Sequence, residues 1–182
     1  LGYDVEVSGN LIVAGARDDD PAGKSNAGSA YVFRRESNGS ITELAKLLHE
    51  DPQSYDHFGW QVAISGNMVA VGAERDDVIF SGSNKPDAGS VTLFKLDGNG
   101  TATRTMTLTA PNPYNSCYFG SAVAMSGDML AVGEYRRNTT ISYSGRVYLY
   151  KINPNGTAQL TTTIDSPNPR NYGYFGISVD LS

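Results

Sequence analysis

Two acidic stretches of this chain carry the residues whose types and spacing come closest to a metal site. The first contains Asp18, Asp19 and Asp20, and the second contains Asp76 and Asp77. Ca²⁺ takes about six to eight oxygen ligands, several of them carboxylates, so clustered Asp residues are its simplest signal. Asp residues in loops also accept hydrogen bonds from nearby backbone N–H groups, as ordinary turns require. We therefore expect no cofactor and keep calcium as the alternative.

Aromatic side chains gather in the segments that precede the Phe-Gly pairs of the chain. Such rings stack on sugars or anchor protein partners, but they also fill space between packed sheets. The candidates for contact with a partner or a sugar are Tyr55, Tyr114, Tyr118, Tyr172 and Tyr174.

Four asparagines begin N-glycosylation sequons, namely Asn38, Asn99, Asn138 and Asn155. All but Asn138 precede a glycine, and Asn-Gly also favours a type I′ hairpin turn by itself. The sequons therefore allow N-linked glycans, which would place the chain in a secretory pathway, but turn chemistry explains three of them equally well.

Familiar catalytic motifs are absent from the sequence. It contains no Gly-x-Ser-x-Gly elbow, no His-Glu-x-x-His and no phosphate-binding glycine loop. The two histidines, His49 and His57, do not recur in the repeats described below, and no metal-ligand spacing joins them. We therefore expect two ordinary histidines and no enzyme activity.

Composition excludes several classes of partner. The formal net charge is -5 and no run of Lys or Arg occurs, so we expect no nucleic-acid partner. No apolar stretch approaches the roughly 18 residues that a membrane-spanning helix needs. The single cysteine, Cys117, can form neither an internal disulfide nor a Cys-rich metal site.

The elements that position these residues recur along the chain. Phe58-Gly59, Phe119-Gly120 and Phe175-Gly176, with Leu1-Gly2 as a weaker first copy, mark starts separated by 57, 61 and 56 residues. A Ser-Gly pair and then a second glycine follow the first three starts at fixed distances. The predicted repeat units are 1–57, 58–118 and 119–174, and 175–182 is the first strand of a further unit. A repeat of this length indicates stacked supersecondary units.

Each unit reads as four short strands. Residues 60–64 alternate apolar and polar, which predicts a half-buried strand, and residues 68–71 are apolar throughout. A third strand carries large side chains at 91–94, and a Thr-rich fourth strand at 101–109 suits an outer edge. We expect an all-β chain of four-stranded antiparallel β-propeller blades, about three blades of a larger or oligomer-completed propeller. A β-solenoid and a self-contained three-blade fold are the alternatives.

The repeated pattern resembles the FG-GAP repeat family, best seen between Phe58 and Phe94. That resemblance implies the propeller fold found at the head of integrin α subunits. Integrin-type repeats often carry an Asp-rich calcium loop between the first two strands, whereas short Ser-Gly turns stand there in this chain. The family's calcium site therefore transfers to no residue here.

The expected function is a non-catalytic module of an extracellular or cell-surface protein, serving adhesion or assembly. The variable loops 16–27, 73–88 and 134–144 are the expected contacts with a protein partner. A carbohydrate-binding propeller that uses the tyrosines is one alternative. An accessory propeller of a larger enzyme is another, and in either case we expect the segment to belong to a longer chain or larger assembly.

Overall fold

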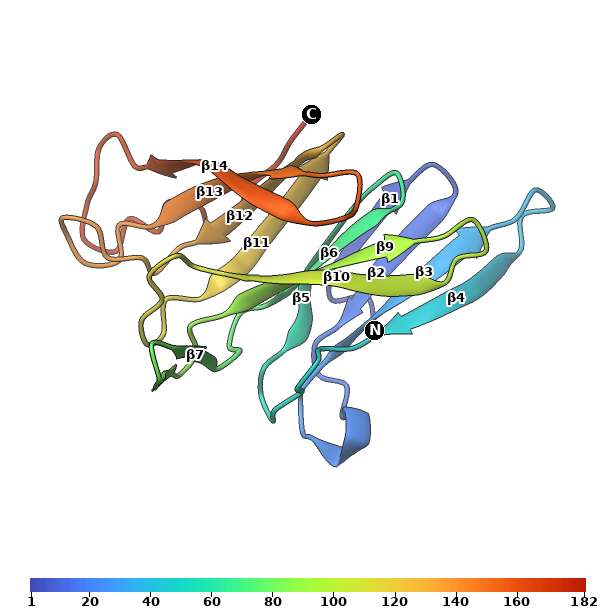
Figure 1. Cartoon of the computed structure of the whole chain (residues 1–182), viewed down its shortest axis with the longest axis horizontal. Helices are drawn as coiled ribbons and strands as arrows, with labels where there is room; N and C mark the ends of the chain where they lie inside the picture. Colours follow the sequence, from blue (N-terminus) through green and yellow to red (C-terminus); the bar gives the residue numbers. More distant parts are fainter.

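The computed structural model describes residues 1–182, and its regular structure is almost entirely β-strand. Three four-stranded antiparallel sheets follow one another along the chain and lie side by side (Figure 1). The prediction of an all-β chain built from four-stranded propeller blades is thereby confirmed. We call the three sheets the first, second and third blades.

The first blade contains β1 (Val5–Ser8), β2 (Leu11–Ala16), β3 (Ser29–Arg35) and β4 (Ile41–Leu47). The second contains β5 (Phe58–Ser65), β6 (Met68–Ala73), β9 (Ser90–Leu96) and β10 (Ala102–Thr109). The third contains β11 (Phe119–Ser126), β12 (Met129–Glu134), β13 (Arg146–Ile152) and β14 (Ala158–Asp165). A 3₁₀ turn, Pro21–Gly23, lies between β2 and β3, and a hairpin of β7 (Val78–Phe80) and β8 (Ser83–Lys85) lies between β6 and β9.

Burial matches the prediction for the second and fourth strands of a blade but not for the first, because Val62, Ala63 and Ile64 of β5 are all buried where a half-buried strand was expected. Every residue of β6 is buried, whereas every residue of β14 after Ala158 is exposed. The apolar second strand is covered on both faces by its neighbours, and the polar fourth strand forms the outer edge.

Hydrophobic cores lie between the blades. One cluster joins the first and second blades around Phe58, and another joins the second and third around Phe119. Both phenylalanines are 0% exposed, and the Phe119 ring meets the Tyr148 ring edge to face at 5.3 Å. The Phe-Gly pairs therefore anchor each blade in the interface with its neighbour.

Glycines bring the backbones of neighbouring blades into direct contact. The Phe119 N–H donates to the Ala88 carbonyl across the second interface at 2.9 Å. A Cβ added to Gly72 in β6 would lie only 2.3 Å from the Gly120 carbonyl oxygen of the next blade. The repeated second-strand glycine is thus required by close approach between blades rather than by a turn.

The Asn-Gly turns differ from the predicted type I′ geometry. Gly39 has a φ of 86°, but Asn38 is not among the residues with positive φ. Type I′ needs positive φ at both central residues. The Gly39 N–H donates instead to the Glu36 carbonyl at 2.9 Å, within a loop longer than the two-residue connection that type I′ serves.

Antiparallel order places three kinds of segment at one end of every sheet. These are the Phe-Gly starts, the loops after the second strand and the links from a fourth strand to the next blade. Phe175 makes an isolated parallel bridge with Gly145. The repeat boundaries, including a further unit beginning at 175, stay a prediction.

Candidate functional site

Aromatic and arginine side chains gather at this end of the blades, and we call them the aromatic–arginine face. They come from the segments around the Phe-Gly starts and from the loops after the second strands. The members are Tyr3, Arg17, His57, Trp60, Arg75, Tyr118, Tyr135, Arg136, Tyr143, Tyr172 and Tyr174.

The first part of the face is built around Arg17, which follows β2. Its guanidinium carbon lies 4.0 Å from the Tyr3 ring centre and 4.4 Å from the Trp60 ring centre. The His57 ring stacks on Trp60 at 5.9 Å with an angle of 12° between the rings. These are cation–π and stacking contacts, which hold the rings in fixed positions.

The second part is built around Arg136, which follows β12. Its guanidinium carbon lies 4.6 Å from the Tyr118 ring, 5.6 Å from Tyr135 and 5.9 Å from Tyr143. Tyr135 in turn meets Tyr174 at 5.4 Å. One arginine thus contacts aromatic side chains from two segments, namely the link before β11 and the loop between β12 and β13.

The backbone that carries these rings is held in an unusual conformation. His57, Tyr118 and Tyr174 have φ values of 56°, 58° and 51°, which non-glycine residues rarely adopt. Bonds between blades hold this geometry, since the Tyr118 N–H donates to the Asp87 carbonyl at 3.3 Å. Strained residues of this kind tend to cluster at binding sites, where they fix side-chain direction.

A pocket of about 280 Å³ opens between the two parts of the face. Trp60, Glu74, Ser121 and Tyr135 are among the residues that line it. Glu74 is 3% exposed, and its Oε1 lies 3.7 Å from the Arg75 Nε. The pocket is thus lined by the aromatic rings of Trp60 and Tyr135 and by the polar side chains of Glu74 and Ser121.

Burial raises the pKa of Glu74 to about 7, and the charges of Arg75, Arg17 and Arg136 limit that rise. A carboxyl that titrates near neutral pH is able both to give and to accept a proton there. The buried Nε atoms of Arg17 and Arg136 have no hydrogen-bond partner. The site therefore offers a proton-exchanging carboxyl beside unused guanidinium donors.

The structure divides the predicted tyrosines into three groups. Tyr118 and Tyr174 lie in the aromatic–arginine face, and Tyr172, which is 61% exposed, joins it through Tyr143 at 5.2 Å. Tyr114 lies apart, donating its OH to the Arg136 carbonyl at 2.7 Å. Tyr55 is 56% exposed and belongs to no aromatic pair.

The acidic loops do not form one joint cluster. Asp18 lies 3.4 Å from Arg17, and Asp20 accepts from the Asn26 N–H at 2.7 Å. Asp77 accepts from the Asp87 N–H at 3.0 Å. Asp20 and Asp77 thus make the backbone hydrogen bonds expected of loop aspartates, whereas Asp18 pairs with the Arg17 side chain.

The remaining two of the five predicted aspartates occupy equivalent positions in neighbouring blades but have different surroundings. Asp19 accepts from Ser29, Tyr31 and Lys46. Asp76 is buried beside His49, with 3.5 Å between the His49 Nε2 and the Asp76 Oδ2.

All four sequon asparagines are exposed. Asn38 and Asn155 use their side-chain oxygens to accept from the backbone N–H two residues later, at 2.9 and 3.1 Å. Asn138 accepts from the Tyr143 N–H at 2.8 Å. Whether any of them carries a glycan stays a prediction.

The sequence reasoning missed Trp60, Glu74, Tyr135 and the arginines. One signal was present: an arginine stands two or three residues after each second-strand glycine, as in Gly15 with Arg17 and Gly133 with Arg136. An arginine side chain therefore recurs at the same place in each blade, just after the second strand.

Two solved structures illustrate what this fold resembles. A protein from Lactobacillus plantarum matches with 18% identity and a TM-score of 0.50, covering 90% of this chain and 40% of that chain. The periplasmic gluconolactonase PpgL of Pseudomonas aeruginosa matches with 17% identity and a TM-score of 0.47, covering 85% of this chain and 38% of that chain. The chain thus spans about two fifths of either structure, and at these identities the likeness shows the fold alone.

Two expectations drawn from the sequence are corrected. We predicted a non-catalytic adhesion or assembly module and no enzyme, yet a protein named as a lactonase is among the structures that this chain resembles. Missing sequence motifs were a poor reason to exclude catalysis, because catalytic groups meet in space rather than in sequence. Both expectations are therefore withdrawn.

No helix in the structure has the length and apolar character needed to cross a membrane. The FG-GAP repeat family matches residues 1–33, 41–94 and 103–150. These three matched segments cover most of the sequence and contain all or part of every strand except β14. The chain therefore belongs to the FG-GAP repeat family.

Proposed function

We propose that the chain binds a saccharide that carries an anionic group, at the aromatic–arginine face. The observation behind this proposal is the pocket in which Trp60 and Tyr135 flank the buried carboxyl of Glu74. Sugars present apolar C–H faces to aromatic rings and hydroxyl groups to polar side chains. Ligand pockets generally combine apolar walls with a few fixed polar groups of this kind.

The arginines favour an anionic ligand over a neutral one. The chain as a whole has a formal net charge of -5, whereas Arg17, Arg75 and Arg136 act together on Glu74. Arginine donates in a planar fork that matches carboxylates. A bound carboxylate would supply a hydrogen-bond partner for the Arg136 Nε, which otherwise has none, and a second anionic partner for Arg17, whose Nε lies 3.4 Å from the Asp18 Oδ1.

The test is calorimetric titration of the chain with oligosaccharides of uronic acids and, separately, with matched neutral oligosaccharides. We expect binding of the acidic series and a loss of at least tenfold in affinity for Trp60→Ala and for Arg136→Gln. A tenfold loss corresponds to about 1.4 kcal/mol.

Lys151→Gln is the control because it also removes a positive charge, from a side chain that is 61% exposed on β13. Equal losses for Lys151→Gln and Arg136→Gln would mean that only overall charge matters. No binding of either saccharide series by the wild type would contradict the proposal outright.

We propose further that the chain works outside the cytoplasm. The exposure of Asn38, Asn99, Asn138 and Asn155 is compatible with glycan attachment. Peptide mass spectrometry of the protein from its native source tests this location, since hexosamine-bearing masses at these sites require passage through a secretory pathway.

A further inference from the structure

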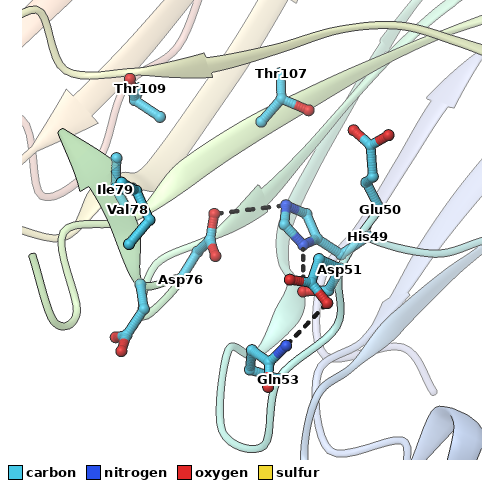
Figure 2. A pocket seen from close by; sticks show the side chains of 10 residues that line it. His49, Glu50, Asp51, Gln53, Asp76, Val78, Ile79, Thr107 and Thr109 are labelled. Carbon is cyan, nitrogen blue, oxygen red and sulfur yellow. Dashed lines mark hydrogen bonds and ion pairs between the residues drawn. The ribbon is translucent and has the colours of Figure 1, made fainter. Parts of the chain in front are cut away.

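A cluster of one imidazole and two carboxylates is buried where the first and second blades meet. His49 follows β4, Asp56 lies in the link to the second blade, and Asp76 follows β6. Their ligand-type atoms all lie within 4.8 Å of one another. Asp56 is 2% exposed and Asp76 is 7% exposed, and the His49 side chain is 9% exposed. Figure 2 shows the imidazole of His49 directed at the carboxylate of Asp76.

The tautomer of His49 leaves a lone pair inside this cluster. Its Nδ1 lies 3.2 Å from the Asp51 carbonyl oxygen, which only accepts, so Nδ1 carries the proton and donates it. In the neutral ring, Nε2 is then an acceptor. This Nε2 is buried without a hydrogen-bond partner and faces the Asp76 Oδ2 at 3.5 Å. A lone pair facing a carboxylate is repulsive unless a proton or a metal cation lies between them.

A hydrogen bond from Nδ1 to a carbonyl is also what orients metal-ligating histidines. Asp56 is oriented in a similar way, because its Oδ2 accepts from the Gln53 N–H at 2.6 Å. Its other oxygen is left for a different partner. Both side chains are therefore held in place before any ligand arrives.

Comparison of the blades shows that Asp76 lacks the cationic partner that its counterpart Asp19 has. Asp19 stands four residues after Gly15, as Asp76 does after Gly72. The Asp19 carboxylate accepts from the Tyr31 OH at 2.8 Å and from the Lys46 Nζ at 3.1 Å. In the first blade, a lysine of the same blade thus balances the negative charge.

In the second blade, threonines replace the tyrosine and the lysine, whereas Ser90 stands at the position of Ser29. Thr92 of β9 is the equivalent of Tyr31, because each lies opposite the residue before the second-strand glycine. Thr107 is the equivalent of Lys46, because Thr107 lies opposite Thr92 and Lys46 lies opposite Tyr31. A threonine hydroxyl carries no charge, so Asp76 has no cationic partner within its own blade.

The cluster borders an open pocket of about 370 Å³. Its lining includes Glu50, Asp77 and Thr107 but no lysine or arginine. The pocket gives solvent access to the cluster, and its acidic rim favours positive ions.

We propose that His49, Asp56 and Asp76 bind one divalent transition-metal cation, with Zn²⁺ as the best fit. Ca²⁺ prefers six to eight oxygen ligands, whereas Zn²⁺ accepts imidazole nitrogen with carboxylate oxygens. Zinc ligands at about 2.0–2.2 Å from a tetrahedral ion lie roughly 3.3–3.6 Å apart. The 3.5 Å between the His49 Nε2 and the Asp76 Oδ2 fits this spacing. Three protein ligands leave the fourth position open to the pocket, and this site does not depend on the saccharide proposal.

The test is calorimetric titration of the metal-free chain with Zn²⁺, followed by Mn²⁺ and Ca²⁺. We expect one Zn²⁺ per chain, bound more tightly than Ca²⁺. His49→Gln and Asp76→Asn should each lower the zinc affinity at least tenfold, with circular dichroism confirming that both variants fold.

The chain provides matched controls for both substitutions. His57→Gln changes the only other histidine, and Asp19→Asn changes the equivalent aspartate of the first blade. Both should leave zinc affinity unchanged. The absence of stoichiometric zinc binding by the wild type would overturn the proposal, as would equal affinity in the His49→Gln variant.

Nitrogen NMR of the His49 ring distinguishes a metal from a proton at Nε2. Zinc should shift the Nε2 resonance while Nδ1 stays protonated. If the ring stays an imidazolium at neutral pH even in excess Zn²⁺, Nε2 holds a proton that zinc does not replace. The proposal would then fail.

Discussion

Replacing Gly72 by alanine tests whether a glycine is needed at this position because the backbones of two blades touch there. The added Cβ would lie 2.3 Å from the Gly120 oxygen and 3.3 Å from the Gly120 carbonyl carbon. Carbon and oxygen atoms that are not bonded rarely approach within about 3.3 Å, so the blades must separate by roughly 1 Å. The obstacle is backbone, which has no alternative rotamer.

That separation would loosen the packing around Phe119 and lengthen its 2.9 Å hydrogen bond to the Ala88 carbonyl. Overpacking a well-packed interior costs about 1–3 kcal/mol, and a backbone obstacle favours the upper end. For a chain of this size, about 3 kcal/mol corresponds to a fall in Tm of about 6–12 °C. Thermal unfolding followed by circular dichroism measures it.

Two other glycines make the test specific. An added Cβ at Gly98 meets nothing within 4 Å and the backbone φ there is ordinary, so Gly98→Ala should change the free energy of unfolding by less than about 0.5 kcal/mol. Gly66 also has open space but a φ of +57°, so Gly66→Ala should cost about 1–2 kcal/mol from backbone strain alone. If Gly72→Ala is no worse than Gly66→Ala, close approach between blades is not the reason for the glycine.

Three further predictions concern the core between the second and third blades. Phe119→Ala should lower the free energy of unfolding by about 3–5 kcal/mol in urea titrations, because its ring is 0% exposed and leaves a cavity; a loss below about 1 kcal/mol would mean that the interface collapses around the gap. Tyr148→Phe should cost about 1–3 kcal/mol, since the Tyr148 OH donates to the buried Glu134 Oε2 and the Glu134 Oε1 accepts no hydrogen bond; an unchanged urea midpoint would argue against that hydrogen bond. Burial raises the pKa of Glu134 above 4.5, so between pH 4.5 and the folded-state pKa the native chain holds a proton that the unfolded chain has lost, and stability falls as pH rises through this range. In Glu134→Gln, the free energy of unfolding should therefore fall less steeply as the pH rises than in the wild type. The same dependence of the free energy of unfolding on pH in both proteins would contradict this.

The blade architecture could be predicted because its causes are local. The apolar run at 68–71 and the threonines at 101–109 predicted correctly a covered second strand and an exposed edge strand. The alternation between 60 and 64 predicted a half-buried strand wrongly, because Val62, Ala63 and Ile64 are all buried. The turn geometry was less predictable, since Asn38-Gly39 fits either a two-residue or a longer hairpin loop. Only Gly39 takes positive φ because five residues, 36–40, connect β3 to β4.

The candidate sites were predicted only in part. Tyr118 and Tyr174 recur before a Phe-Gly pair, so their place at the end of the blades followed from the repeat. Trp60 and Glu74 looked like ordinary residues at the start of one strand and the end of another. Their meeting in one pocket depends on how neighbouring blades are placed, and no pattern within a single repeat reports that.

By itself, the sequence determined the repeat, the strand order and the polarity of the second and fourth strands, because hairpin turns and the composition of a strand act over a few residues. Only the tertiary structure decided which side chains meet across blades. His49 and Asp76 are 27 positions apart, one after the fourth strand of a blade and the other after the second strand of the next. Packing between blades sets their 3.5 Å separation, because the Phe-Gly contacts and the glycines fix how closely the two sheets approach.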